Sequence, residues 1–223
     1  MLQVVPNYVH LLFFVSVLIA FIMFMKATNS SKISITIMLF WITFQSILGI
    51  SHFYTYTQSI PPRFLLLIAP PVFLIVLLFI TAKGRLFIDS LNINFLMLLH
   101  TVRIIVELVL YFLFCSKQIP INMTFEGGNF DMFSGITAPL IYYFGFVQKK
   151  LNTRIILFWN FLCLTLLINV VVNSVLSSPF PFQKFGFEQP NIAVLYFPFV
   201  LLPSFIVPLV LFSHLTIIRK LTK

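Results

Sequence analysis

HTVRIIVELVLYFLFCSKQIPINMTFEGGNFD, residues 100–131, joins an apolar segment to a polar loop and carries three of the chain's five acidic residues. An ionisable group near the middle of a membrane helix costs about 2.5–3.5 kcal/mol, so such groups are expected to have a use. His100, Arg103 and Glu107 follow the spacing i, i+3, i+7, which places them on one face of a helix. The stretch therefore predicts a membrane span with a site inside it.

The remainder of the chain has the composition of a membrane protein. Of the 223 residues, 60% are hydrophobic and only 9% are charged, a combination that soluble domains of this size do not show. The net charge is +9, but Lys and Arg stand singly or in pairs between apolar runs. That distribution is typical of membrane loops, and we expect no nucleic-acid partner.

Seven segments approach the roughly 20 apolar residues that a helix needs to cross a bilayer. The predicted spans are residues 7–26, 33–56, 63–82, 94–116, 131–148, 153–176 and 192–217. Short loops rich in Asn, Ser, Lys, Gly and Pro separate them, and no stretch is long enough for a soluble domain. The sequence therefore predicts one all-α domain over residues 1–223, a polytopic seven-helix transmembrane bundle.

Lys and Arg are distributed unequally among the loops. Three lie in the second, fourth and sixth loops, and Arg103 lies within a span. The first, third and fifth loops and the C-terminal tail contain Lys26, Lys32, Lys83, Arg85, Lys149, Lys150, Arg154, Arg219, Lys220 and Lys223. Because cytoplasmic loops carry the excess of positive charge, this predicts an external N-terminus and a cytoplasmic C-terminus. The expected location is the bacterial inner membrane.

Polar residues gather on the second, fourth and sixth spans, and prolines on the third, fifth and seventh. Proline frees a backbone carbonyl, which inside a bilayer must meet protein or a water-filled cavity. Broken helices that face polar helices predict a central polar cavity. The side chains expected along an ion or substrate pathway through it are His100, Arg103, Glu107, His52, Gln45, Asn169 and Asn173.

Arg103 and Glu107 are four residues apart, so we expect them to pair directly. The pair has two interpretations: a site for an ion, proton or substrate, or a structural lock between helices. Glu126, Asn129 and Asp131 surround Gly127-Gly128 in the loop that follows. These three residues predict an outer-loop binding site, or, alternatively, capping of the next helix by Asn129 or Asp131. Their spacing matches no calcium loop, and no metal is expected.

The leading functional prediction is a small-solute or ion transporter coupled to protons. Glu107 would respond to protons, Arg103 would be its partner or an anion anchor, and His100 would relay protons toward the cytoplasm. The expected partners are the lipid bilayer and a small solute or ion, while a homo-oligomer or a membrane-protein partner stays open.

Two other classes of function remain open. One is a seven-helix sensor or assembly subunit that binds a ligand or partner through its outer loops. The other is a membrane enzyme or haem redox protein, because the four histidines fall at two depths, as in bis-histidine haem proteins. An enzyme is less favoured, since no HExxH or GxSxG motif occurs, and no cofactor is expected.

Overall fold

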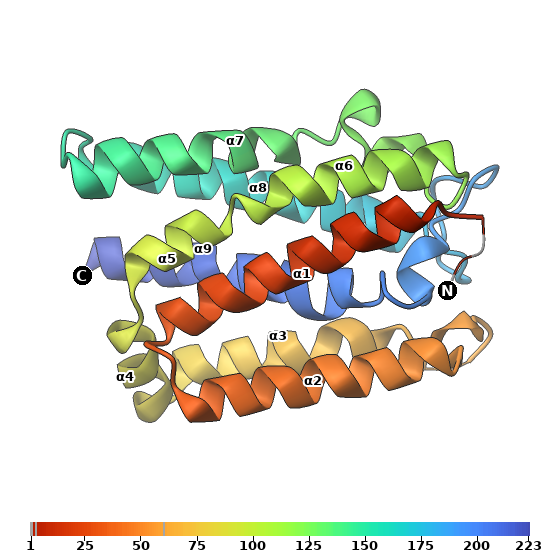
Figure 1. Cartoon of the computed structure of the whole chain (residues 1–223), viewed down its shortest axis with the longest axis horizontal. Helices are drawn as coiled ribbons and strands as arrows, with labels where there is room; N and C mark the ends of the chain where they lie inside the picture. Colours follow the sequence, from red (N-terminus) through yellow and green to blue (C-terminus); the bar gives the residue numbers. More distant parts are fainter. Residues whose placement is uncertain (1, 3, 60) are drawn as a thin grey trace.

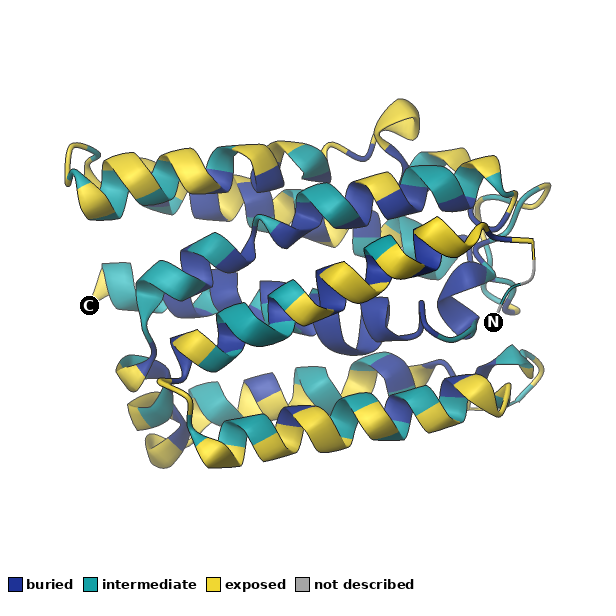
Figure 2. Ribbon diagram, viewed as in Figure 1, coloured by how far each residue is buried: buried dark blue, intermediate teal, exposed yellow. Residues whose placement is uncertain are grey.

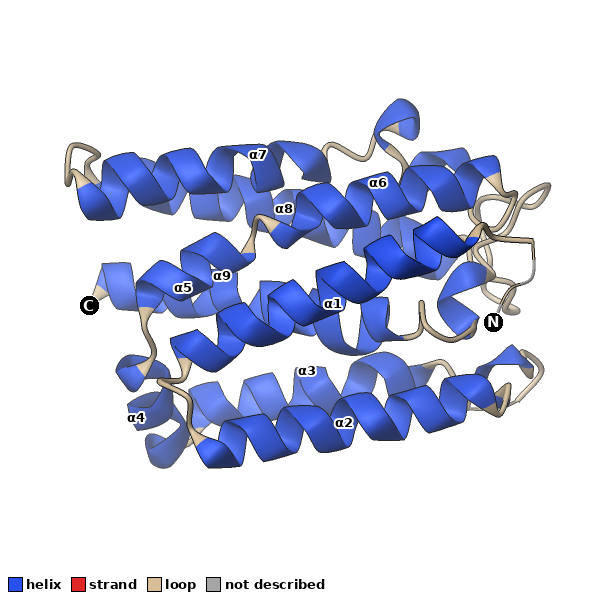
Figure 3. Ribbon diagram, in the orientation of Figure 1, coloured by secondary structure: helices blue, strands red, loops and turns tan. Residues whose placement is uncertain are grey.

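The computed structural model describes residues 2, 4–59 and 61–223, and all regular structure in this part of the chain is helical (Figure 3). The α-helices are α1 (Asn7–Ala27), α2 (Lys32–Ile50), α3 (Leu65–Ile80), α4 (Ala82–Ser90), α5 (Ile93–Leu99), α6 (Val102–Cys115), α7 (Asp131–Ile141), α8 (Thr153–Leu176) and α9 (Val207–Thr222). One π-helix, Tyr142–Val147, continues α7, and a second, Leu202–Ile206, leads into α9.

Among the described residues, five helical segments are long and apolar enough to cross a membrane, as an integral membrane protein requires. They are α1, α2, α5 with α6, α8, and α9 with its π-helix. Helices α3 and α4 form a sixth candidate span only if they count as one, and they meet at 95°. Helix α7 and its π-helix are 11 and 6 residues long, short for a crossing. The all-helical membrane architecture is confirmed, whereas the seven crossings and their direction stay predictions.

Several predicted boundaries differ from the structure. Helix α2 ends at Ile50, because the chain turns at His52, whose φ of 57° lies in the left-handed region. The last long helical segment begins at Leu202, about ten residues after the predicted start. Helix α4 was expected as a loop. It forms because Thr81 is extended and accepts the backbone N–H of Gly84, which starts a new helix in another direction.

The long helices run alongside one another, and the two termini lie at opposite ends of the bundle (Figure 1). The segments Ile93–Cys115 and Leu202–Thr222 form the centre, since 61% of the residues in their most apolar stretches are buried, against 17% for Lys32–Ile50. Figure 2 shows the same contrast between the largely buried α9 and the exposed outer face of α2. The bundle therefore has a buried core around α6 and α9 and a peripheral α2.

Helix α2 is attached to the core through a backbone carbonyl whose helical donor position is occupied by a proline. The indole N–H of Trp41 donates to the carbonyl of Ser204 at 2.8 Å. Pro208, four residues further along, has no N–H to donate to that carbonyl. A buried carbonyl without a donor is costly in a bilayer, so the Trp41 hydrogen bond both satisfies it and holds α2 in place.

A second hydrogen bond from α2 follows the same rule. Gln45 is buried, and its Nε2 donates at 3.2 Å to the carbonyl of Leu66, which Pro70 leaves without its helical donor. The Gln45 Oε1 accepts a hydrogen bond of 2.5 Å from the Tyr54 hydroxyl. Gln45, predicted as part of a solute pathway, therefore holds α2 against α3.

Candidate functional site

The site forms where the central span is interrupted between α5 and α6. The backbone N–H groups of His100 and Thr101 donate to residues three positions earlier, at 3.3 and 3.1 Å. Such bonds tighten the helix locally, and they separate α5 from α6 at the depth of the ionisable residues (Figure 1). The predicted span 94–116 is thus two helices with the site at their junction.

Arg103 forms a buried, bidentate ion pair with Asp131. Its Nε donates to Asp131 Oδ2 at 2.6 Å, and its Nη2 donates to Asp131 Oδ1. The two side chains are only 3% and 7% exposed, so water screens the pair little. Arg103 Nη2 also donates to the carbonyl of Cys163 on α8, at 3.2 Å. The guanidinium therefore joins α6, α7 and α8.

The expected pairing of Arg103 with Glu107 is wrong. Side chains on a helix lean toward its N-terminus, and a basic residue four positions before an acidic one is the less favourable order for a pair. Asp131, at the start of α7, instead offers both carboxylate oxygens to the planar guanidinium. The carboxylate of another helix therefore replaces the one on the same helix.

His214 of α9 completes the partners of Arg103. Arg103 Nη1 lies 3.0 Å from His214 Nε2, and His214 Nδ1 lies 3.0 Å from the side-chain oxygen of Asn160. A guanidinium has only donors, so His214 Nε2 accepts and its Nδ1–H donates to Asn160. Asn160 Nδ2 in turn donates to the carbonyl of Ile156, which orients the amide. This network requires a neutral His214.

His100 lies face to face with His214, at the junction of α5 and α6. Their ring centroids are 3.9 Å apart, and Trp159 contacts both rings. Among the described residues, no partner reaches either ring nitrogen of the buried His100. The stacked rings leave no space for a porphyrin between them, so this pair does not provide bis-histidine ligation. The described chain also contains no group of three or more His, Cys, Asp or Glu that could hold a metal ion.

Glu107 is held by an amide. Asn129 Nδ2 donates to both Glu107 oxygens, at 2.8 and 2.9 Å, and lies 3.0 Å from the carbonyl of Met123. Asn129 Oδ1 accepts the backbone N–H of Asp131 at 3.0 Å, so Asn129, which precedes the N-cap Phe130, satisfies the first free N–H of α7. In the part of the chain that the structure describes, no cation lies within ion-pair distance of Glu107.

The predicted outer-loop cluster is divided by its two glycines. Gly128 has a φ of 100°, and a Cβ on Gly127 would lie 2.0 Å from the carbonyl oxygen of Ile121. Only glycine fits either position without strain. The tight turn directs Asn129 inward and leaves the Glu126 side chain exposed on the surface. Asn129 and Asp131 thus belong to the buried site, and Glu126 does not.

A close approach of α7 to α6 brings Asp131 to Arg103. A Cβ on Gly135 would lie 2.8 Å from Ile104 Cγ1 and 2.9 Å from the Ile104 backbone nitrogen. Those distances are shorter than van der Waals contact, so a larger residue would hold the helices apart. Gly135, one turn after Asp131, therefore permits the close approach of the helices at which the ion pair is found.

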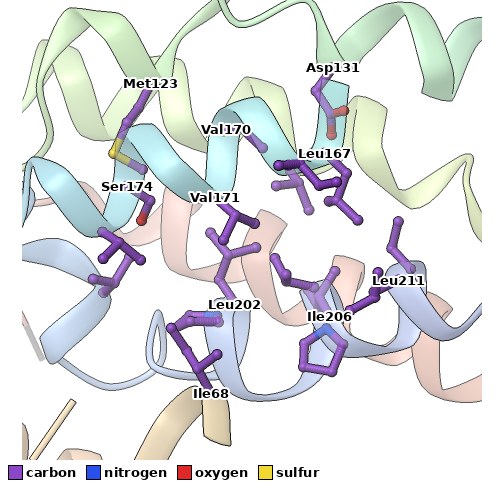
Figure 4. A pocket seen from close by; sticks show the side chains of 18 of the residues that line it. Ile68, Met123, Asp131, Leu167, Val170, Val171, Ser174, Leu202, Ile206 and Leu211 are labelled. Carbon is purple, nitrogen blue, oxygen red and sulfur yellow. The ribbon is translucent and has the colours of Figure 1, made fainter. Parts of the chain in front are cut away.

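A cavity of about 180 Å³ adjoins this network, between α3, α6, α8 and the α9 segment. Figure 4 shows aliphatic side chains such as Leu167, Val171 and Ile206 around it, with Asp131 at its edge. Arg103 and Glu107 contribute to the same wall. The cavity at this helix is thus mostly apolar with a charged side, where the sequence predicted a polar cavity.

The other predicted pathway residues do not line this cavity. His52 is exposed beyond the end of α2 and packs edge-on against Tyr196. Asn169 is exposed on α8, with its Nδ2 3.5 Å from the carbonyl of Gly128, and Asn173 donates to Asn169 at 3.3 Å. These residues, like Gln45, lie apart from the charged network.

Sequence reasoning missed three groups that contact Arg103 or its partners: His214, Asn160 and the Cys163 carbonyl. His214 carried a signal, because it falls at the same predicted depth as His100. Asn160 was visible as a polar residue within an apolar span. The Cys163 carbonyl carried no signal, because every residue has one.

The fold and site define an all-helical membrane protein with a buried, multi-helix network of ionisable side chains. Within that class, the chain belongs to the family described as "Domain of unknown function (DUF8737)", whose model matches residues 60–222. The match includes every residue of the network and excludes α1 and α2. No curated protein and no solved structure matches the chain.

Proposed function

We propose that this protein moves a small solute or ion across a bilayer, the bacterial inner membrane, and couples the movement to protonation of Glu107. The charge count at the cavity wall carries the proposal. Arg103 and Asp131 neutralise each other, whereas among the described residues the Glu107 carboxylate accepts hydrogen bonds from the Asn129 amide and from no cation. An ionised Glu107 leaves an uncompensated negative charge in apolar surroundings, and a bound proton or cation removes it.

The cavity supports a particular class of solute. Its wall is mostly aliphatic, with Arg103, Asp131 and Glu107 on one side. A solute with an apolar body and one charged or polar end would match both surfaces. We assign His100 as the proton relay, because its buried ring nitrogens are unpartnered among the described residues and it stacks on the network through His214.

The proposal includes seven crossings with an external N-terminus. The termini at opposite ends of the bundle agree with an odd number of crossings (Figure 1). In this arrangement the π-helix Tyr142–Val147 extends α7 to the end of the bundle at which the C-terminus lies. The same end holds most of the lysines and arginines, as a cytoplasmic face does.

Proteoliposomes with an entrapped pH-sensitive dye test the coupling. Mixtures of small amines, monocarboxylates and amino acids are added outside, and a solute-dependent change in internal pH is expected. Glu107→Gln should abolish the change, and Glu126→Gln, an exposed carboxylate in the same stretch, should retain it. Wild-type proton movement in Glu107→Gln would overturn the proposal.

Infrared spectroscopy tests the protonation without a known solute. The C=O stretch of a protonated carboxylic acid should titrate with pH in the wild-type protein and be lost in Glu107→Gln. It should persist in Asp131→Asn, because Asp131 is held ionised by Arg103. A band that disappears in Asp131→Asn and persists in Glu107→Gln would contradict the assignment of Glu107.

A further inference from the structure

Helix α2 lies close to the core over only half of its length. Trp41 and Gln45 bond to the core, and a Cβ on Gly49 would lie 2.8 Å from Val200. In the half that begins at Lys32, exposed residues predominate, and Ile33 is 74% exposed. The first half of α2 therefore stands away from the core, whereas the second half contacts it.

A groove of about 540 Å³ occupies the space between this half of α2, α3 and α9. The volume lies in the range of about 300–1,000 Å³ typical of small-molecule sites. Its walls are mostly hydrocarbon and include Ile37 of α2, Leu74 of α3 and Phe212 of α9. Among the described lining residues, only Ser34, Trp41 and Ser204 bring polar side-chain atoms to it, and the latter two are bonded to backbone carbonyls. The groove therefore suits an alkyl chain.

The end of the groove near the start of α2 is positively charged. Lys32 precedes the lining residue Ile33, and Lys83 lies one helical turn before the lining residue Phe87. Neither Lys32 nor Lys83 forms an ion pair within the described chain. Asp89, the acidic residue at this end, is already bound by two other cations. This end of the groove therefore favours a ligand with an anionic group.

We propose that the groove binds one anionic phospholipid, with an acyl chain between α2 and α9 and the phosphate at Lys32 and Lys83. The two parts of the ligand match two observations, a hydrocarbon slot and an uncompensated basic mouth. Each lysine near an anionic lipid surface is worth about fivefold in affinity. The site is separate from the Arg103 network and does not depend on the proposed transport.

Trp41 lines the groove and provides a probe of its occupant. The chain has two tryptophans, so Trp159→Phe leaves Trp41 as the single fluorophore. This variant is placed in bilayers of phosphatidylglycerol and phosphatidylcholine, in which one lipid at a time carries brominated acyl chains that quench nearby indoles. At equal mole fraction, brominated phosphatidylglycerol should quench Trp41 more strongly than brominated phosphatidylcholine. If Trp159→Phe lowers the melting temperature, the quenching of Trp41 is obtained instead by subtracting the quenching of Trp41→Phe from that of the wild-type protein.

The double variant Lys32→Gln, Lys83→Gln should reduce the preference for phosphatidylglycerol by tenfold or more, about fivefold for each lysine. Lys117→Gln with Lys184→Gln, an equal change of charge at the other end of the bundle, should leave the preference intact. Equal quenching by the two lipids in the parent protein would overturn the proposal. So would a preference that survives the loss of Lys32 and Lys83.

Discussion

Arg103 and Asp131 form a buried ion pair across 28 residues of sequence, with Arg103 Nε 2.6 Å from Asp131 Oδ2. The attraction between two charges is stronger inside a protein than in water, and two parallel hydrogen bonds fix their geometry. Because Asp131 is the first residue of α7, the pair holds the start of that helix against the junction of α5 and α6. The stability of the bundle and the form of the cavity wall both depend on it.

The first prediction concerns this pair. Asp131→Asn leaves Arg103 buried with no countercharge, and breaking a buried pair costs about 3–5 kcal/mol. For a chain of this length, the melting temperature in detergent should fall by about 6–20 °C. Glu107→Gln should lower it much less, because Glu107 forms no ion pair with any cation that the structure describes. Arg103→Gln with Asp131→Asn removes both charges and should recover most of the loss; a double variant as unstable as Asp131→Asn would contradict the pairing.

The second prediction concerns the hydrogen bond from Trp41 to the Ser204 carbonyl. Trp41→Phe should cost about 0.6 kcal/mol, and up to about 1.7, as interhelical hydrogen bonds in membranes do. Pro208→Ala supplies the missing backbone N–H, so Trp41→Phe should cost less in that background. Melting temperatures of the two single variants and the double variant measure this coupling. If the losses in melting temperature of the two single variants simply add in the double variant, Trp41 does not compensate for the N–H that Pro208 lacks.

The third prediction concerns the contact of α7 with α6. In Gly135→Ala, the new methyl group meets the backbone nitrogen of Ile104, which cannot move without the helix, so a loss of about 1–3 kcal/mol is expected. Gly145→Ala is the matched control. Its methyl group meets Cδ1 of Ile156, the flexible end of a side chain, at 2.9 Å. The two melting temperatures should differ, and equal values would argue against a backbone approach at Gly135.

The fourth prediction concerns pH at the C-terminal end of α9. Hydrogen bonds from Lys223 and then Arg219 hold the pKa of Asp89 below its ordinary value of 3.8. A lowered pKa means that the folded state favours the ionised carboxylate, so this contribution is complete above the ordinary pKa. It is lost as the pH falls through the lowered value. The melting temperature of wild type should exceed that of Asp89→Asn at neutral pH, and the difference should vanish in acid.

High salt should reduce the same difference, because the Asp89 cluster is partly exposed and surface ion pairs are screened. Lys184→Gln, far along the chain from the cluster, serves as the control for a general effect of charge. A difference that grows on acidification would have the wrong sign for this ion pair.

The fifth prediction concerns sidedness. Reporter fusions after Lys83 and after Lys150 should be active as cytoplasmic reporters, and fusions within 118–130 as external ones. The excess of Lys and Arg in the first, third and fifth loops is the reason. A cytoplasmic signal from 118–130 would exclude the seven-crossing arrangement.

The sequence alone predicted an all-helical membrane protein. It predicted seven crossings, whereas within the described residues five segments, or six with the bent pair, are long and apolar enough. The thickness of the bilayer requires about 20 apolar residues, a local property that can be counted along the chain. The same reasoning drew attention to residues 100–131, which hold part of the candidate site, because ionisable side chains are rare in this chain and costly in lipid. It could not detect the breaks at His100 and Thr81, since no proline or glycine stands at either position.

Only the tertiary structure decided which groups pair. Spacing along a helix allowed Arg103 to meet Glu107, but the close approach of α7 at Gly135 offers Asp131 instead. In the same way, Gln45 has the appearance of a pathway residue until Leu66, 21 residues away, is seen to need its hydrogen bond. A buried polar group bonds to whichever partner the packing brings within reach. The packing of helices that are distant in sequence cannot be inferred from the sequence of any single helix.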